Sequence, residues 1–227
     1  MRVVRFLRLC YNISVKIILK MGLIVKIPFR YQVTNCDCVP TTFINALQYL
    51  FSRDEIPPAV IQKIMLYSLD SINQYGEDGK NGTTGLAIQL IMQWLQSFSN
   101  DKFALDCEYL PQEQIHLRRG NKIISCINRG GVALLRVKAG KAKTAPFHYM
   151  LALGVDGDDR DWLLFFDPYY RVKSFTGEDA EYLKWLGGSN PQGANLRIKR
   201  ERLDSCENAK YSMASVDERE CCLLERV

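Results

Sequence analysis

The first hundred residues carry apolar side chains at intervals of three and four, the spacing of a helix with one buried face. The clearest case has Phe43, Ile44, Leu47 and Leu50 on one face and predicts a helix over residues 38–51. Two further helices with the same spacing are predicted over 57–69 and 85–98.

From about residue 103 onward the pattern changes to short apolar runs that are rich in β-branched, Leu and aromatic residues, which predicts strands. The predicted strands cover residues 103–110, 131–138, 147–157 and 161–170. The last two should form a hairpin across the sequence GDDRD. Other predicted elements are a short strand over 22–29, a long Gly- and Asn-rich loop over 71–84, helices over 121–131 and 178–186, and a final strand over 221–227.

Helices in the first part and strands in the second predict an α+β fold, in which a helical N-terminal part packs against an antiparallel sheet. With 227 residues, the chain is long enough for one large domain. We interpret the two parts as lobes of a single domain over residues 21–227, preceded by a separate segment over residues 1–20.

The N-terminal segment is basic. Residues 1–30 contain seven Lys or Arg and no acidic residue, which leaves 23 basic against 25 acidic residues in the rest of the chain. The body therefore has no basic stripe suited to a nucleic-acid backbone. The longest uncharged run of the segment, Leu9–Val15, is short beside the roughly 20 apolar residues of a transmembrane helix. We interpret residues 1–20 as a basic leader or disordered arm, and contact with a membrane surface is the alternative.

Eight cysteines are scattered along the chain without a C-x-x-C pair. A chain of this length needs no disulfides to hold its core and shows no secretory signal, so we expect reduced thiols and a cytoplasmic location. Only two histidines are present, which leaves few ligands for a typical structural zinc site. We therefore expect neither a metal nor another cofactor.

Cys38 stands where the first predicted helix begins, two residues before Pro40. Proline is favoured in a first helical turn, and a helix N-terminus supplies partial positive charge and free N–H groups. Because the thiolate is the reactive form of cysteine, this position suits a nucleophile, with an inert core cysteine as the alternative. Cys36 is interpreted as a bystander, and a resolving thiol that protects an oxidised Cys38 is its alternative role.

A nucleophilic cysteine needs a base, and histidine is the usual one. His148 opens the predicted strand over 147–157, whereas His116 lies among polar residues and is expected at the surface. Asp167 ends the neighbouring predicted strand, so a hairpin would place it beside His148, where a carboxylate orients the imidazole. Taken singly, a histidine at the entry of a strand, such as His148, is more often structural, and Asp167 before Pro168 is a common turn signal.

Gln32 stands six residues before Cys38. Its side-chain amide and the backbone N–H of Cys38 are candidate donors to the oxyanion of an acyl-transfer intermediate. The segment QVTNCDCVPTT, together with the order Gln32, Cys38, His148 and the Asp167–Pro168 pair, resembles the papain-like cysteine peptidases. The chain is most similar to their bacteriocin-processing branch, whose peptidases act on double-glycine leaders, and to the standalone relatives of that branch.

The resemblance covers residues from about 27 to 170. It implies a papain-like fold, hydrolysis of a peptide bond in a peptide or protein substrate, and the four roles described above. Val39 departs from the family pattern, which usually has glycine directly after the nucleophile. Two alternatives stay open: a thiol acyltransferase that uses the same triad, and a catalytically inactive relative that acts as a binding module, which Val39 favours.

Overall fold

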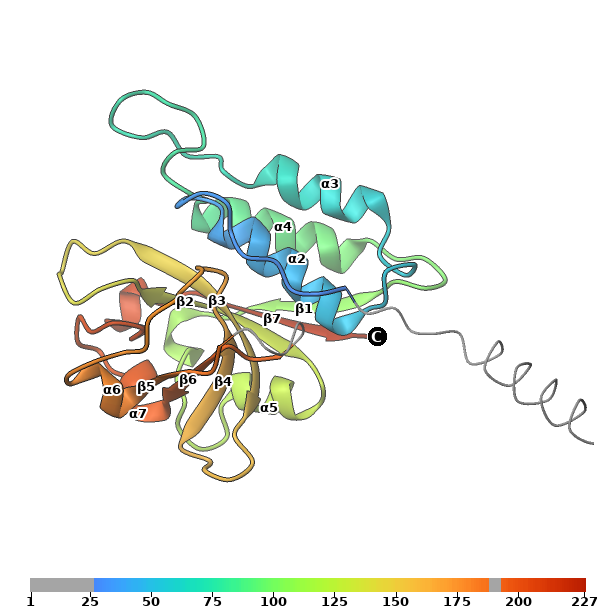
Figure 1. Cartoon of the computed structure of the whole chain (residues 1–227). Coiled ribbons are helices and arrows are strands. Elements are labelled where there is room, and N and C mark those ends of the chain that lie inside the picture. Colours follow the sequence, from blue (N-terminus) through green and yellow to red (C-terminus); the bar gives the residue numbers. More distant parts are fainter. Residues whose placement is uncertain (1–26, 188–192) are drawn as a thin grey trace, which may run out of the picture.

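The computed structural model describes residues 27–187 and 193–227. Within these ranges one antiparallel sheet has the strand order β1-β7-β2-β3-β4-β6-β5. The strands are β1 (Leu105–Tyr109), β2 (Val132–Lys138), β3 (Phe147–Val155), β4 (Trp162–Phe166), β5 (Leu183–Trp185), β6 (Leu196–Lys199) and β7 (Cys221–Arg226). Helices lie against both faces of this sheet (Figure 1). The predicted α+β fold, with its helical N-terminal part against an antiparallel sheet, is confirmed.

The N-terminal helices cover one face of the sheet (Figure 1). They are α2 (Cys38–Leu50), α3 (Pro58–Tyr67) and α4 (Gly85–Ser97), and each lies close to its predicted bounds. Pro57 is the N-cap of α3 and Pro58 is its first residue, which costs no hydrogen bond because the first helical N–H groups have no partner within a helix. Thr84 caps α4 by accepting a hydrogen bond from the Ala87 N–H at 3.2 Å.

The opposite face is covered by shorter helices. They are α5 (Lys122–Asn128) and the one-turn helices α6 (Asp179–Tyr182) and α7 (Arg200–Leu203), and two 3₁₀ turns, η1 (Gln112–Gln114) and η2 (Val216–Glu218), complete the described elements. Helix α5 matches the helix predicted over 121–131, and its N-cap Asn121 accepts a hydrogen bond from Ile124 N–H at 2.8 Å.

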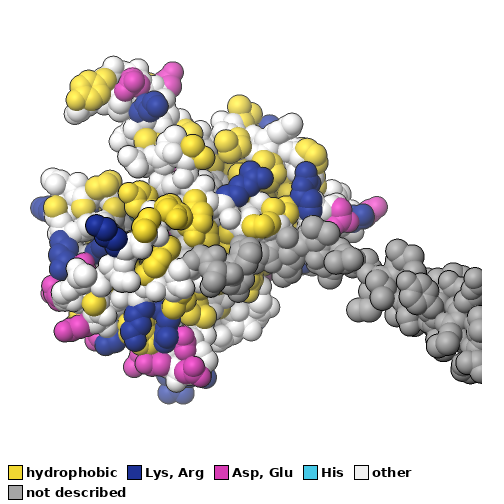
Figure 2. Space-filling model, viewed as in Figure 1, with side chains coloured by type: hydrophobic (Ala, Val, Ile, Leu, Met, Phe, Trp, Pro, Cys, Tyr) yellow, Lys and Arg dark blue, Asp and Glu magenta, His cyan; other side chains and the backbone are white. Residues whose placement is uncertain are grey.

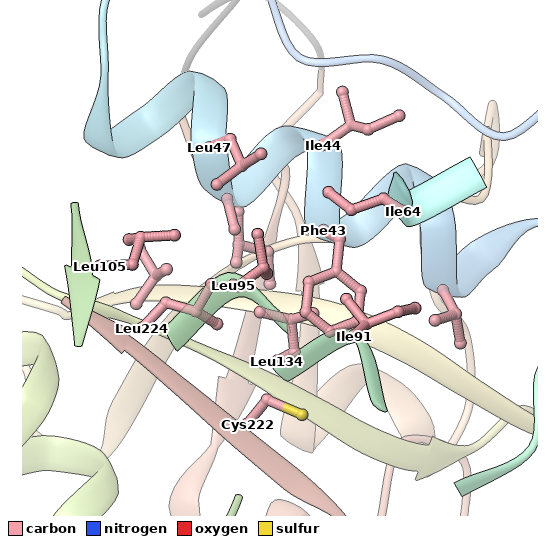
Figure 3. Packing of buried hydrophobic residues seen from close by; sticks show 14 of the residues in the cluster. Phe43, Ile44, Leu47, Ile64, Ile91, Leu95, Leu105, Leu134, Cys222 and Leu224 are labelled. Carbon is pink, nitrogen blue, oxygen red and sulfur yellow. The ribbon is translucent and has the colours of Figure 1, made fainter. Parts of the chain in front are cut away.

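Both faces of the sheet are buried, so alternate residues of one strand enter two different cores. In β2, Leu134 belongs to the core under α2, α3 and α4, whereas Leu135 belongs to the core on the side of α5. The strand at the end of the chain divides in the same way, with Cys222 and Leu224 in the first core. Figure 3 shows Phe43 of α2 packed among side chains from α4, β2 and β7. Strand residues therefore alternate between the two cores, as the pleat of a sheet requires.

The predicted hairpin is present as β3 and β4. Leu151 pairs with Phe166 and Val155 with Leu163, and a β-bulge lies between Ala152 and Gly154. Strand β4 ends at Phe166, four residues before the predicted end. The final predicted strand is confirmed as β7, which pairs with both β1 and β2. The end of the chain thus lies inside the sheet and not at its edge.

One sequence prediction was wrong, and a second was wrong in the part that the structure describes. The helix predicted over 178–186 is one turn, α6, followed by the strand β5, because Leu183 is buried and its strand pairs with β6. The strand predicted over 22–29 is not formed in its described part, residues 27–29; the rest of it, like the basic segment 1–20, lies outside the described residues. Across the two described ranges, no helix combines the length and the apolar character needed to cross a membrane.

Candidate active site

Cys38 is the first residue of α2, and its side chain is buried. Asp37 holds the N-cap position but makes no side-chain capping bond to the helix. Its carboxylate turns back instead and accepts hydrogen bonds from Val33 N–H at 3.0 Å and Thr34 N–H at 2.9 Å. The first turn of a 13-residue helix therefore keeps its partial positive charge next to the Cys38 thiol.

Helix α2 is fastened to β3 by Thr42. Its hydroxyl donates to the carbonyl oxygens of Cys38 at 2.7 Å and of Tyr149 at 3.1 Å. Thr42 is fully buried, so both bonds lie away from solvent. The start of α2 is thereby held beside the start of β3, the strand on which His148 is the second residue.

His148 and Asp167 form a buried pair. Nε2 of His148 lies 2.7 Å from Oδ1 of Asp167, and His148 is 8% exposed. Burial disfavours the charged ring, but the charge and hydrogen bond of Asp167 outweigh it and raise the pKa of His148 from 6.5 to about 10. The Cys38 side chain adds a smaller upward contribution, as a hydrogen-bond partner and as a charge. The contact between His148 and Asp167 is the one that the hairpin predicted, and the ring also interacts with the Cys38 side chain; its catalytic role stays a prediction.

The Asp167 carboxylate has further partners. Oδ1 also accepts from Tyr169 N–H at 2.8 Å, and Oδ2 accepts from the Tyr211 hydroxyl at 2.6 Å. The Asn195 side chain holds the backbone of Asp167 at both ends: its Oδ1 accepts from Asp167 N–H at 2.8 Å, and its Nδ2 donates to Asp167 O at 2.9 Å. Asp167, Asn195 and Tyr211 are all buried, so most of this polar network lies away from solvent.

These hydrogen bonds keep Asp167 ionised. Burial on its own would raise the pKa of the carboxyl, but the charge and hydrogen bond of His148 and the hydrogen bonds from Tyr211 and Tyr169 hold it below 3.8. Burial and the neighbouring carboxylate raise the pKa of the Tyr211 phenol well above 10, so it acts as a donor. Sequence reasoning missed Tyr211 and Asn195, because each reaches Asp167 from a distant segment and no local motif marks either residue.

Gln32 lies beside the segment that follows Asp167. Its backbone N–H donates to Pro168 O at 2.8 Å, and its side-chain Nε2 donates to Thr34 O at 2.7 Å. One amide hydrogen is thus used inside the turn that leads to Cys38, which leaves the second for another acceptor. The structure therefore places Gln32 next to Pro168, the residue that directly follows Asp167. Its role as an oxyanion donor stays a prediction.

Four of the other described cysteines have thiols whose pKa is raised by burial. Burial raises the pKa of Cys107 and Cys126 to about 12 and raises those of Cys221 and Cys222 well above 9. A thiol of high pKa is a poor nucleophile near neutral pH. Cys36, by contrast, is half-buried and lies within hydrogen-bonding distance of Lys80 O, at 3.2 Å.

Val39 and His116 have no part in the contacts of the pair that are described above. Val39 is 1% exposed and belongs to the core on the side of α2, α3 and α4. Its side chain therefore packs inward. His116 lies between η1 and α5 and accepts from Arg118 N–H through Nδ1 at 3.3 Å. Among the residues that the structure describes, no group of three or more His, Cys, Asp or Glu side chains is arranged to hold a metal ion.

No family model and no curated protein match this sequence. Among solved structures, the chain is similar to the peptidase domain of Streptococcus mutans ComA. The alignment covers 88% of this chain and 98% of that domain, with 11% sequence identity and a TM-score of 0.36. A similarity this weak assigns neither a family nor an activity to this chain. The function is therefore inferred from the geometry of Cys38, His148 and Asp167.

Proposed function

We propose that this protein is a papain-like cysteine peptidase that hydrolyses a peptide or amide bond. Cys38 is the nucleophile, His148 the general base and Asp167 the residue that orients the imidazole. The observation that carries the proposal is the contact of His148 Nε2 with Asp167 Oδ1, at 2.7 Å, in a ring that also interacts with the Cys38 side chain at the start of α2. Nucleophile, base and orienting group within reach of one another are the signature of covalent catalysis.

The chemistry begins with transfer of the thiol proton from Cys38 to His148. The Asp167 carboxylate holds Nε2, which leaves Nδ1 as the ring nitrogen that accepts the thiol proton. The thiolate attacks the carbonyl carbon, and the carbonyl π electrons move onto oxygen. His148 then returns its proton to the leaving amine, which departs and leaves a thioester on Cys38. A water molecule, deprotonated by His148, hydrolyses that thioester and restores the free thiol.

The oxyanion of each tetrahedral intermediate needs donors. The backbone N–H of Cys38 is the first, because it belongs to the uncapped end of α2. The second is the Gln32 amide, which keeps one hydrogen beyond its bond to Thr34. The inward packing of Val39 supports activity over the inactive binding module, because a side chain directed into the core does not crowd the substrate side.

Exposed apolar side chains near the site favour a peptide substrate. Val33 is 92% exposed and Tyr170 is 63% exposed, and their segments meet where Gln32 N–H bonds Pro168 O. Figure 2 shows hydrophobic side chains gathered between the helical layer and the strands.

We also propose a reducing compartment such as the cytoplasm, because every cysteine in the described ranges is a free thiol.

The test is cleavage of a mixed peptide library, followed by mass spectrometry, with wild type, Cys38→Ala and Cys36→Ala proteins. We expect cleavage by the wild type and by Cys36→Ala, and none by Cys38→Ala. In H₂¹⁸O the new carboxyl group should gain one ¹⁸O atom, as hydrolysis requires, whereas transfer to another acceptor would leave it unlabelled. Cleavage that persists in Cys38→Ala would overturn the proposal.

A further inference from the structure

Tyr211 contacts the candidate triad from outside it. The residue lies in the loop between α7 and η2. Its hydroxyl donates to Oδ2 of Asp167 at 2.6 Å, and its side chain is 3% exposed. The ring packs edge-on against Phe175 at a centroid distance of 6.0 Å. Tyr211 therefore reaches the one carboxylate oxygen that His148 does not use.

The Asp167 carboxylate depends on this bond. Asp167 is fully buried, and a buried ionised oxygen without a donor is strongly disfavoured. Oδ1 is satisfied by His148 and by Tyr169 N–H. Among the described residues, Tyr211 provides the hydrogen bond to Oδ2. The phenol thus adds to the interactions that favour the ionised carboxylate, and it holds the oxygen opposite the one that faces the imidazole.

The backbone at Tyr211 supports a positioning role. Its φ of 61° lies in the left-handed region, which a bulky residue seldom adopts. Two backbone hydrogen bonds hold the loop there: Tyr211 N–H donates to Lys138 O, and Lys138 N–H donates to Ser212 O, each at 2.8 Å. A strained conformation held in place by its surroundings is often found where a side chain must be aimed.

Basic groups also surround the carboxylate. His148 is the closest of them, and it faces Cys38 on its other side. Lys210 interacts with the charge of Asp167, and Arg171 interacts with the Tyr211 phenol through its charge. His148 and Lys210 favour an ionised Asp167, but among the described residues neither of them bonds Oδ2, so the hydroxyl of Tyr211 has a role that they do not fill.

We propose that Tyr211 is a positioning residue of the active site, whose hydroxyl holds Asp167 ionised and aligned so that Asp167 can orient His148. This inference rests on the proposed function for its catalytic meaning. The contact between Tyr211 and Asp167, and its effect on the His148–Asp167 pair, can be tested without any substrate.

The test compares Tyr211→Phe with the matched control Tyr149→Phe. Each change removes one buried phenol hydroxyl that donates to a carboxylate, and the control loses its bond to Glu220 instead of Asp167. The first readout is the rate of Cys38 alkylation by iodoacetamide from pH 3 to 8. Loss of a hydrogen bond to a charged group raises a carboxyl pKa by about one to two units. We expect the acid limb of the Tyr211→Phe profile to move upward by that amount, and that of Tyr149→Phe to stay within about 0.3 unit.

A second readout separates this inference from the proposed function. The chain has only two histidines, so the variant His116→Gln leaves the His148 ring as a single NMR signal. The pH at which acid breaks the His148–Asp167 pair should rise in Tyr211→Phe by the same amount as in the alkylation profile. This measurement holds even if Cys38 proves unreactive, a result that would contradict the proposed function alone. An acid transition equal to that of the wild type would overturn the role of Tyr211.

If Tyr211→Phe fails to fold by circular dichroism, 3-fluorotyrosine placed at position 211 keeps the shape and the hydroxyl. Its phenol is more acidic and donates a stronger hydrogen bond, so the acid transition of the His148 signal should move to lower pH. A transition that does not move on fluorination would equally overturn the proposal.

Discussion

Nε2 of His148 lies 2.7 Å from Oδ1 of Asp167, which joins the beginning of β3 to the residue that follows β4. The two strands pair in antiparallel register, with Leu151 opposite Phe166. The contact is therefore a direct consequence of the hairpin. The bonds of Thr42 to Cys38 O and Tyr149 O hold this end of β3 beside the start of α2.

Replacing Asp167 with Asn should lower kcat and leave the fold intact. Asn keeps the shape of the side chain, but it removes the charge that stabilises the protonated His148 ring. The loss should be smaller than that in His148→Ala, because general acid–base catalysis as a whole contributes about 10²–10⁴-fold. Steady-state kinetics on a peptide found in the library screen measures both losses. A larger loss in Asp167→Asn than in His148→Ala would contradict the assigned roles.

Replacing Gln32 with Ala should lower kcat by about 10²-fold, the usual loss when one oxyanion donor is removed. The alkylation rate of Cys38 should change little, because iodoacetamide forms no oxyanion. Gln48→Ala is the control, because Gln48 is a buried glutamine on α2, away from the segment that carries Gln32. If Gln32→Ala slows alkylation as much as turnover, Gln32 acts on the thiol or on the fold and is not an oxyanion donor.

The stability of the protein should depend on pH through His148. Its pKa rises from 6.5 to about 10 on folding, so its contribution to the free energy of unfolding is complete below about pH 6.5 and declines as the pH rises toward 10. The decline is at most about 1.4 kcal/mol per pH unit. Urea titrations should compare Cys38→Ser with Cys38→Ser/His148→Gln, so that ionisation of the thiol does not enter. A difference between the two variants that stays constant from pH 6.5 to 9.5 would contradict this shift.

Replacing Thr42 with Val should destabilise the protein by about 1–3 kcal/mol, the cost of leaving a buried polar group without its partner. The Thr42 hydroxyl is buried and bridges Cys38 O and Tyr149 O. Thr41→Val, which makes the same chemical change one residue earlier, should cost less. Urea unfolding followed by circular dichroism measures both. Equal losses in the two variants would show that the bridge between α2 and β3 adds nothing.

The elements that support the site could be predicted because their signals are local. The apolar spacing of Phe43, Ile44 and Leu47 fixed the helix that begins at Cys38. Two apolar runs around a polar turn predicted the hairpin that joins His148 to Asp167. In each case a pattern that repeats within about ten residues determines which side chains are buried.

The remainder depends on contacts between distant segments. Strand β5 is three residues long, and its identity comes from its pairing with β6, which no local spacing encodes. Tyr211 meets Asp167 across 44 positions of sequence and Asn195 meets it across 28. The sequence therefore predicted that His148 and Asp167 lie close together, but it did not predict the residues that hold Asp167 in place.

The most direct test of the central claim is alkylation of the folded protein by iodoacetamide near neutral pH, followed by peptide mapping. We expect Cys38 to be modified faster than any other cysteine, and we expect His148→Ala to slow this modification and to move its pH profile to higher pH. The contrary result is faster modification of Cys36 or Cys107, or a Cys38 profile that His148→Ala leaves unchanged.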